Sequence, residues 1–78
     1  MKVYMLTFDG LEKEKVFSSM RKAQDYRDSR IEKIVSALPP SFTHKVSHYA
    51  YEETRLEITA PSGNKLKYVY KITTYNVL

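Results

Sequence analysis

Apolar residues dominate the first positions of the chain. Residues 2–8 are rich in β-forming side chains, and apolar residues fall on both of the alternating faces. This pattern predicts an interior strand of a sheet. Asp9-Gly10 follows and favours a tight hairpin turn, because glycine accepts the positive φ that such turns need. The returning strand is expected over residues 12–17, where its run of alternating charges is typical of an edge strand.

The apolar spacing changes to a helical period after Ser18-Ser19, which supplies an N-cap. The apolar residues of this period are Met20, Ala23, Ile31, Ile34, Val35 and Leu38. They predict a helix from Met20 to about Leu38, which Pro39-Pro40 ends. Arg27 interrupts the apolar stripe. Its expected role is to cover the core with its alkyl stem, and a functional arginine at the helix–sheet seam is the alternative.

The second half of the chain predicts a long hairpin with strands over about 48–60 and 65–77. The turn is Pro61-Ser62-Gly63-Asn64. A break at Glu52-Glu53 into two shorter strands is the alternative. The preferred register aligns apolar side chains on one face, because slipping by one residue would mix the two faces. This register pairs Ala60 with Leu66, Ile58 with Tyr68, Leu56 with Tyr70, Tyr51 with Tyr75 and Tyr49 with Val77.

The expected element order is therefore ββαββ within one domain, residues 1–78. The predicted fold class is α+β, with a four-stranded, mostly antiparallel sheet and one helix on one face. The face expected beneath the helix collects Leu56, Ile58, Ala60, Leu66, Tyr68, Tyr70 and Ile72. The opposite face collects Tyr49, Tyr51, Arg55, Glu57, Lys65, Lys67, Val69, Lys71, Thr73 and Tyr75. A single helix leaves this second face without an obvious cover.

Composition is that of a small globular protein rather than a disordered chain. Of 78 residues, 42% are hydrophobic and 28% are charged. The chain has no cysteine, so it has no disulfide and no thiolate site. Asp9 interrupts the short apolar run of the N-terminus, which is not typical of a signal peptide, and no segment is long enough to cross a bilayer. We therefore expect a cytoplasmic protein without a membrane partner.

The sequence offers no constellation typical of catalysis. His44 and His48 lie in a segment that reads as a strand, where four residues separate side chains by roughly 13 Å, too far for one metal ion. Glu52 and Glu53 point to opposite faces of a strand. Only two glycines occur, both in predicted turns, which excludes a glycine-rich phosphate loop. We expect no catalytic residue, no metal site and no cofactor, and hence no enzyme.

The uncovered face combines aromatic and basic side chains, in a chain of net charge +4 and pI near 9.4. Tyrosine and arginine are frequent anchors of protein interfaces. The residues predicted to bind a partner are Tyr49, Tyr51, Arg55, Lys67, Lys71 and Tyr75. The leading hypothesis is a contact surface for another protein. Nucleic-acid binding by the same face, homodimerisation through it, and a merely solvated face with cross-strand pairs stay open as alternatives.

The segment from Val16 to Tyr26 follows a predicted hairpin and contains F-S-S-x-x-K-A-x-x-Y at the start of the helix. It resembles a pattern in small uncharacterised open reading frames of tailed phages and their bacterial hosts. The resemblance covers about the first third of the chain, and the motif is structural. It implies a small phage or mobile-element protein that acts in the host cytoplasm by binding and modulating or inhibiting a host protein.

Overall fold

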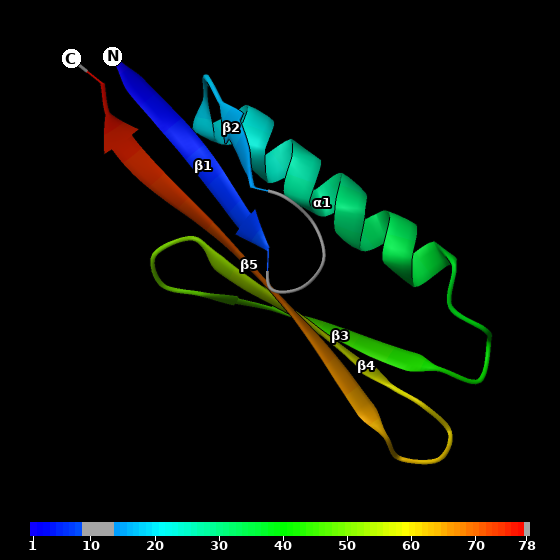
Figure 1. The fold of residues 1–78 in the computed structure, drawn as a ribbon. Helices are drawn as coiled ribbons and strands as arrows, with labels where there is room; N and C mark the ends of the chain where they lie inside the picture. Colours follow the sequence, from blue (N-terminus) through cyan, green and yellow to red (C-terminus); the bar gives the residue numbers. More distant parts are fainter. Residues whose placement is uncertain (9–13, 78) are drawn as a thin grey trace.

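A computed structural model describes residues 1–8 and 14–77, and it shows one helix packed on an antiparallel sheet (Figure 1). Along the chain, the elements are β1 (Lys2–Phe8), β2 (Lys15–Phe17), α1 (Met20–Ser36), β3 (Thr43–Tyr49), β4 (Glu53–Thr59) and β5 (Lys65–Asn76). In space the strand order is β2-β1-β5-β4-β3. The α+β class and the interior position of β1 are confirmed. The predicted Asp9-Gly10 turn and the start of the returning strand lie outside the described residues.

The sheet has five strands, so the predicted four-stranded sheet is wrong. The expected strand over 48–60 is divided because Tyr51 and Glu52 adopt φ values of 62° and 56°. Two consecutive residues in the left-handed region reverse the chain in a tight hairpin turn, which joins β3 to β4. The alternative of a break near Glu52-Glu53 is confirmed. No local signal predicts the turn itself, since neither residue is glycine or asparagine.

The register between β4 and β5 differs from the predicted one by two residues. Ile58 lies opposite Leu66, and Leu56 lies opposite Tyr68. A shift of two residues keeps every side chain on its face, so the predicted apolar face beneath the helix is correct. The expected pairs of Tyr51 with Tyr75 and of Tyr49 with Val77 do not form. The β3–β4 turn takes Tyr49 and Tyr51 away from β5.

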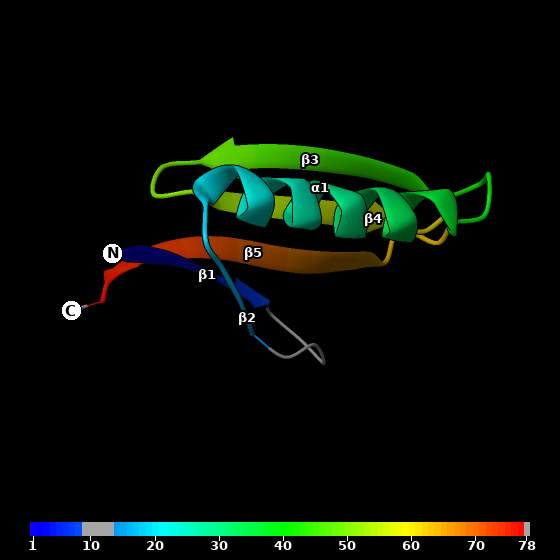
Figure 2. The same ribbon diagram turned by 90° about the horizontal axis from the view of Figure 1, so that it is seen from above.

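β5 is shared between two halves of the sheet. It pairs with β4 over Lys65–Lys71 and with β1 over Tyr70–Asn76, so only Tyr70 and Lys71 have partners on both sides. The β1–β2 hairpin and the β3–β4 hairpin are therefore displaced along β5, as Figures 1 and 2 show. This displacement gives the molecule its elongated shape, with extents of 50 × 20 × 20 Å.

The core lies between α1 and the helix side of the sheet. Its buried hydrophobic residues are Leu6, Ala23, Ile31, Leu56, Ile58, Tyr70 and Ile72. The ring of Phe8 packs edge-on against Tyr70, with 5.3 Å between centroids, which joins β1 to β5 beneath the helix. The helix begins as predicted, because the Ser19 hydroxyl accepts a hydrogen bond of 3.1 Å from the Lys22 N–H. It ends at Ser36, two residues before the predicted end.

Arg27 is buried, with 7% of its surface exposed, so its guanidinium does not reach bulk water. Its Nε donates to Asp28 Oδ1 at 3.0 Å, and its Nη1 lies 3.7 Å from Glu52 Oε2. Gln24 Nε2 also donates to Glu52 Oε2 at 3.2 Å. The arginine in the apolar stripe therefore joins α1 to the β3–β4 turn, at the seam between helix and sheet.

Alkaline pH is expected to destabilise the fold through Tyr70. Burial raises the pKa of its phenol above the ordinary value, and the Arg30 guanidinium opposes part of that rise. Because folding favours the neutral phenol, the unfolded chain ionises first, so this stabilisation is complete below about pH 10 and is lost as the pH rises further. The free energy of unfolding can be measured with guanidinium at about pH 8 and about pH 10.5. Between these two pH values it should fall less for Tyr70→Phe than for wild type. Equal losses would refute this role of Tyr70.

Candidate functional site

The side of the sheet opposite α1 is called here the helix-free face. The buried residues of β1, β4 and β5 are even-numbered, and residues that lie opposite each other in a ladder share a face. The helix-free face is formed by Val16 of β2 and by Val3, Met5, Thr7, Thr43, Lys45, Ser47, Tyr49, Glu53, Arg55, Glu57, Thr59, Lys65, Lys67, Val69, Lys71, Thr73 and Tyr75.

Acidic residues of β4 lie between basic or aromatic residues of the two neighbouring strands. Glu57 lies opposite Lys45 on one side and opposite Lys67 on the other. Glu53 lies opposite Tyr49 and Lys71 in the same way. Opposite charges in adjacent strands attract each other, so part of the positive charge of this face is compensated within the sheet.

Arg55 is held in place at the end of the face near the β3–β4 turn. Its Nε donates to Glu53 Oε2 at 2.8 Å, and its guanidinium carbon lies 4.3 Å from the ring centroid of Tyr49. The guanidinium is thus fixed by an ion pair and a cation–π contact, while 34% of the Arg55 side chain stays exposed. A side chain ordered in advance loses less conformational entropy when it binds a partner.

Tyr51 projects from the β3–β4 turn with 88% of its surface exposed. Its φ of 62° costs a non-glycine residue about 1–2 kcal/mol, and glycine would avoid that cost. Beside it lies an open hollow of about 340 Å³, lined by Met20, Tyr51, Glu52, Lys71, Ile72, Thr73 and Thr74. The turn therefore holds an exposed aromatic side chain on a strained backbone, and the hollow beside it lies toward the helix side, because Met20 of α1 and Ile72 line it.

The six residues predicted to bind a partner do not form one cluster. Tyr49, Arg55, Lys67, Lys71 and Tyr75 lie on the helix-free face, whereas Tyr51 lies in the turn at its end. Four of the six border that turn: Tyr49, Tyr51, Arg55 and Lys71. Lys67 lies two cross-strand rows farther along β5. Tyr75 lies in the other half of the sheet, opposite Val3.

An apolar surface surrounds Tyr75, and it was not among the predicted contact residues apart from Tyr75 itself. Val3 and Met5 of β1, with Val16 of β2, share the helix-free face with this tyrosine. Val16 is 61% exposed, and Tyr75 is 47% exposed. The signal was present as apolar residues on both faces of the segment 2–8, but the sequence does not show that β1 pairs with the C-terminal half of β5.

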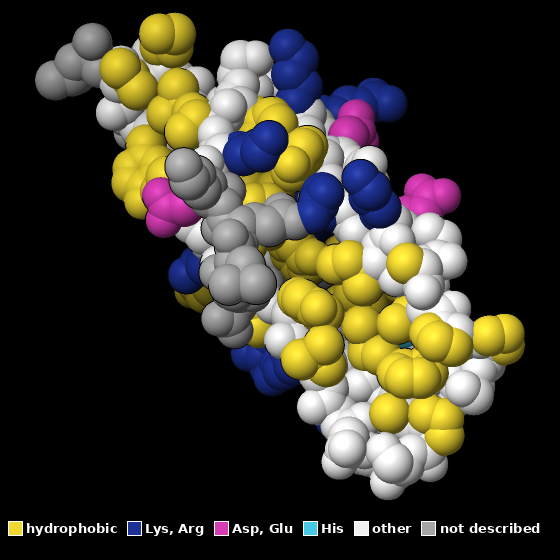
Figure 3. Space-filling model, turned by 45° about the vertical axis from the view of Figure 1, so that its right-hand side comes forward, with side chains coloured by type: hydrophobic (Ala, Val, Ile, Leu, Met, Phe, Trp, Pro, Cys, Tyr) yellow, Lys and Arg dark blue, Asp and Glu magenta, His cyan; other side chains and the backbone are white. Residues whose placement is uncertain are grey.

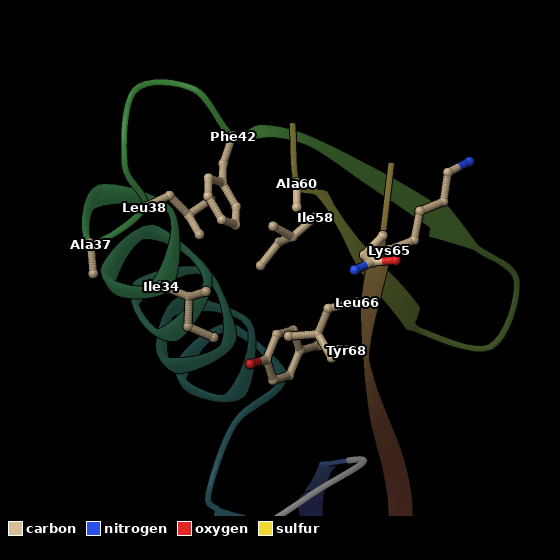
Figure 4. A pocket seen from close by; sticks show the side chains of 10 residues that line it. Ile34, Ala37, Leu38, Phe42, Ile58, Ala60, Lys65, Leu66 and Tyr68 are labelled. Carbon is tan, nitrogen blue, oxygen red and sulfur yellow. The ribbon is translucent and has the colours of Figure 1, made fainter. Parts of the chain in front are cut away.

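A second hollow lies on the helix side of the sheet, at the far end of the molecule. It has a volume of about 430 Å³ between the end of α1 and the β4–β5 hairpin. Figure 3 shows hydrophobic side chains gathered in a patch on this side. The lining residues are Ile34, Ala37, Leu38, Phe42, Ile58, Ala60, Asn64, Lys65, Leu66 and Tyr68, and in Figure 4 the Lys65 side chain extends away from the hollow. The hollow is therefore apolar and has no ammonium group within it.

The two histidines face the helix side of β3, opposite Ile58 and Thr54 of β4. His48 Nδ1 lies 3.0 Å from Thr54 Oγ1, a buried hydroxyl. Within residues 1–8 and 14–77, no three His, Cys, Asp or Glu side chains are grouped so that they could hold a metal ion. The helix in this part of the chain is too short and too polar to span a membrane. Comparison with known proteins finds no matching family model, no similar curated protein and no similar solved structure.

Proposed function

We propose that the chain is a small non-enzymatic binding module whose contact site for another protein is the β3–β4 turn end of the helix-free face. This turn-end site consists of Tyr49, Tyr51, Arg55 and Lys71. The exposed ring of Tyr51 carries the proposal, because it occupies a backbone position where glycine would be unstrained. Strained backbone of this kind is concentrated at functional sites.

The chemistry of the turn-end site suits a protein partner. Tyrosine and arginine are enriched among the residues that contribute most to protein–protein affinity. Arg55 is ordered by Glu53 and Tyr49 before any partner arrives, and Tyr51 exposes its ring at the adjacent turn. The adjacent Lys71 adds a positive charge, which favours an acidic residue on the partner.

The nature of the partner is proposed from the resemblance of residues 16–26 to small phage open reading frames. By that analogy the chain is phage-encoded and acts in the host cytoplasm by binding and modulating or inhibiting a host protein. The motif itself holds the start of α1 against the sheet. The ring centroids of Phe17 and Tyr26 lie 5.4 Å apart, and Ala23 is fully buried. It therefore supports the scaffold, and the turn-end site supplies the contact.

Affinity capture from bacterial lysate, with and without nuclease, followed by mass spectrometry identifies the partner. Calorimetry with the purified partner then tests the site. Tyr51→Gly and Arg55→Ala are each expected to weaken binding by about tenfold or more, because truncating a hot-spot residue costs about 2 kcal/mol or more and 1.4 kcal/mol is tenfold. Tyr75→Ala is the matched control from the other half of the face and should stay within about twofold of wild type. Unchanged affinity of both turn-end variants would reject the site.

Replacing Tyr51 with glycine should also stabilise the folded protein by about 1 kcal/mol, since it removes the left-handed strain. Ala50→Gly is the matched control in the same turn, because Ala50 is not among the residues with positive φ. There glycine adds only flexibility to the unfolded chain and should lower stability by up to about 1 kcal/mol. Guanidinium unfolding followed by circular dichroism measures both changes. A loss of stability in Tyr51→Gly would contradict the assignment of strain.

Nucleic-acid binding is the second candidate, and the charge of the same face favours it. The helix-free face carries five cationic side chains, Lys45, Arg55, Lys65, Lys67 and Lys71. It carries two carboxylates, Glu53 and Glu57. Phosphate contacts release counterions, so affinity for DNA or RNA should fall steeply between about 50 and 200 mM salt. Fluorescence anisotropy with single- and double-stranded probes measures this slope. Absence of binding to any of these probes at low salt would rule out nucleic-acid binding.

A further inference from the structure

The outer edge of β3 carries backbone groups that point away from the sheet. The Ala60 N–H donates to the Asn64 carbonyl at 2.8 Å, so the even-numbered residues of β4 form their hydrogen bonds with β5. The odd-numbered residues of β4 then bond to the odd-numbered residues of β3, because bonding alternates between sides along a strand. The N–H and C=O groups of His44, Val46 and His48 therefore point outward.

No described residue covers this edge. β3 is the last strand of the sheet, and Figure 2 shows it on the outside of the layer. Its seven residues, Thr43–Tyr49, contain no proline, and Lys45 is its only lysine. The opposite edge strand, β2, has three residues. Proteins usually shorten, charge or cover an open edge, since it is a template for pairing with another chain.

We propose that β3 pairs antiparallel with β3 of a second copy, about a two-fold axis at Val46. In this register His44 lies opposite His48 of the partner subunit. Lys45 lies opposite Ser47 of the partner subunit, and Val46 lies opposite Val46 of the partner subunit. Every outward N–H and C=O of the three even-numbered residues then finds an acceptor or donor, and the two sheets become one.

Charge and length favour this register over its neighbours. Slipping by two residues in one direction places Lys45 opposite Lys45 of the partner subunit, and like charges directly opposite are destabilising. The reverse slip leaves His44 opposite Ala50 of the partner subunit, which lies in the β3–β4 turn. The central register also brings together two valines that are each 39% exposed in the monomer. The central register therefore sets no two lysines opposite each other and joins the exposed valines.

The pairing leaves room for both helices. Even-numbered residues of β3 share the helix side with Leu56 and Ile58, so an even-to-even register places both helices on one side of the joined sheet. α1 lies over β4 rather than over β3 (Figure 2), so three strand spacings, about 14 Å, separate the two helices, which is more than the roughly 8–10 Å between packed helices. This dimer is independent of the proposed partner-binding function, because it uses the backbone of β3 rather than the side chains of the turn-end site.

Sedimentation velocity from about 1 μM to about 1 mM tests the dimer. Wild type is expected to rise from the 9.2 kDa of one chain toward twice that mass. Val46→Lys sets two ammonium groups opposite each other and should raise the dissociation constant by about fivefold or more. Val16→Lys makes the same charge change on the β2 edge and should dimerise like wild type. A monomer at every concentration, or a Val46→Lys dimer as tight as wild type, overturns the proposal.

The register is tested by cross-linking, because the natural chain has no cysteine. Val46→Cys places two thiols on facing residues of an antiparallel pair, where the Cα atoms lie about 5.5 Å apart and a disulfide can form. His44→Cys places its two thiols about 13 Å apart along the strands, which prevents one. Under mild oxidation, covalent dimer is expected for Val46→Cys only. Dimer that forms as readily through His44→Cys refutes the two-fold at Val46.

Discussion

Leu56→Ala is expected to lower the free energy of unfolding by about 2–5 kcal/mol. Leu56 is fully buried in β4, beneath the helix and opposite Tyr68 of β5. Alanine leaves a cavity that the surrounding strands can fill only in part, because the hydrogen bonds to β3 and β5 hold the backbone on both sides. This loss is a large part of the total stability expected for 78 residues, roughly 4–12 kcal/mol.

Guanidinium unfolding followed by circular dichroism measures this loss, and Leu66→Ala is the matched control. Leu66 lies opposite Ile58 on the same side of the sheet, but 54% of its surface is exposed. Its truncation removes little buried area and should cost less than about 1 kcal/mol. If the two variants lost equal stability, Leu56 would not lie at the centre of the core.

Glu52→Ala is expected to cost about 2 kcal/mol, because it removes the carboxylate shared by Arg27 and Gln24. The side chain of Arg27 is 8% exposed, so water cannot fully replace the lost partner. Arg27→Met should cost less, since it removes the buried charge and keeps an apolar stem of similar length. The Glu52 carboxylate, 41% exposed, then remains solvated.

A double-mutant cycle distinguishes this ion pair from independent effects of the two residues. Glu52→Ala in the Arg27→Met background should cost at least about 1 kcal/mol less than it does in wild type. The exposed pair of Arg21 with Asp25, at 3.9 Å on the helix surface, is the control. Arg21→Ala should change stability by less than about 0.5 kcal/mol. Additive losses for Arg27 and Glu52 would show that the seam is not held by their interaction.

The sequence by itself determined the elements whose signals are local. Ser19 caps the helix through its own hydroxyl, and Pro39-Pro40 follows close after the last turn. The period-two alternation assigned the strand residues of the second half to the correct faces, because strand geometry alone decides which residues share a face. Tyr51 is the exception, since it lies in the β3–β4 turn. The alternation therefore placed Arg55, Lys67 and Lys71 on the uncovered side before any pairing was known.

Only the tertiary structure decided how those strands meet. The turn at Tyr51 and Glu52 has no glycine, and distant residues hold it: Arg27 contacts the Glu52 carboxylate, and the Ile72 N–H donates to the Glu52 carbonyl. The two-residue error in register arose because the apolar pattern repeats every two residues and accepts both alignments equally. Pairing of β1 with the far half of β5 then separated Tyr75 from the turn-end site, and no local pattern encodes a contact between residues so distant along the chain.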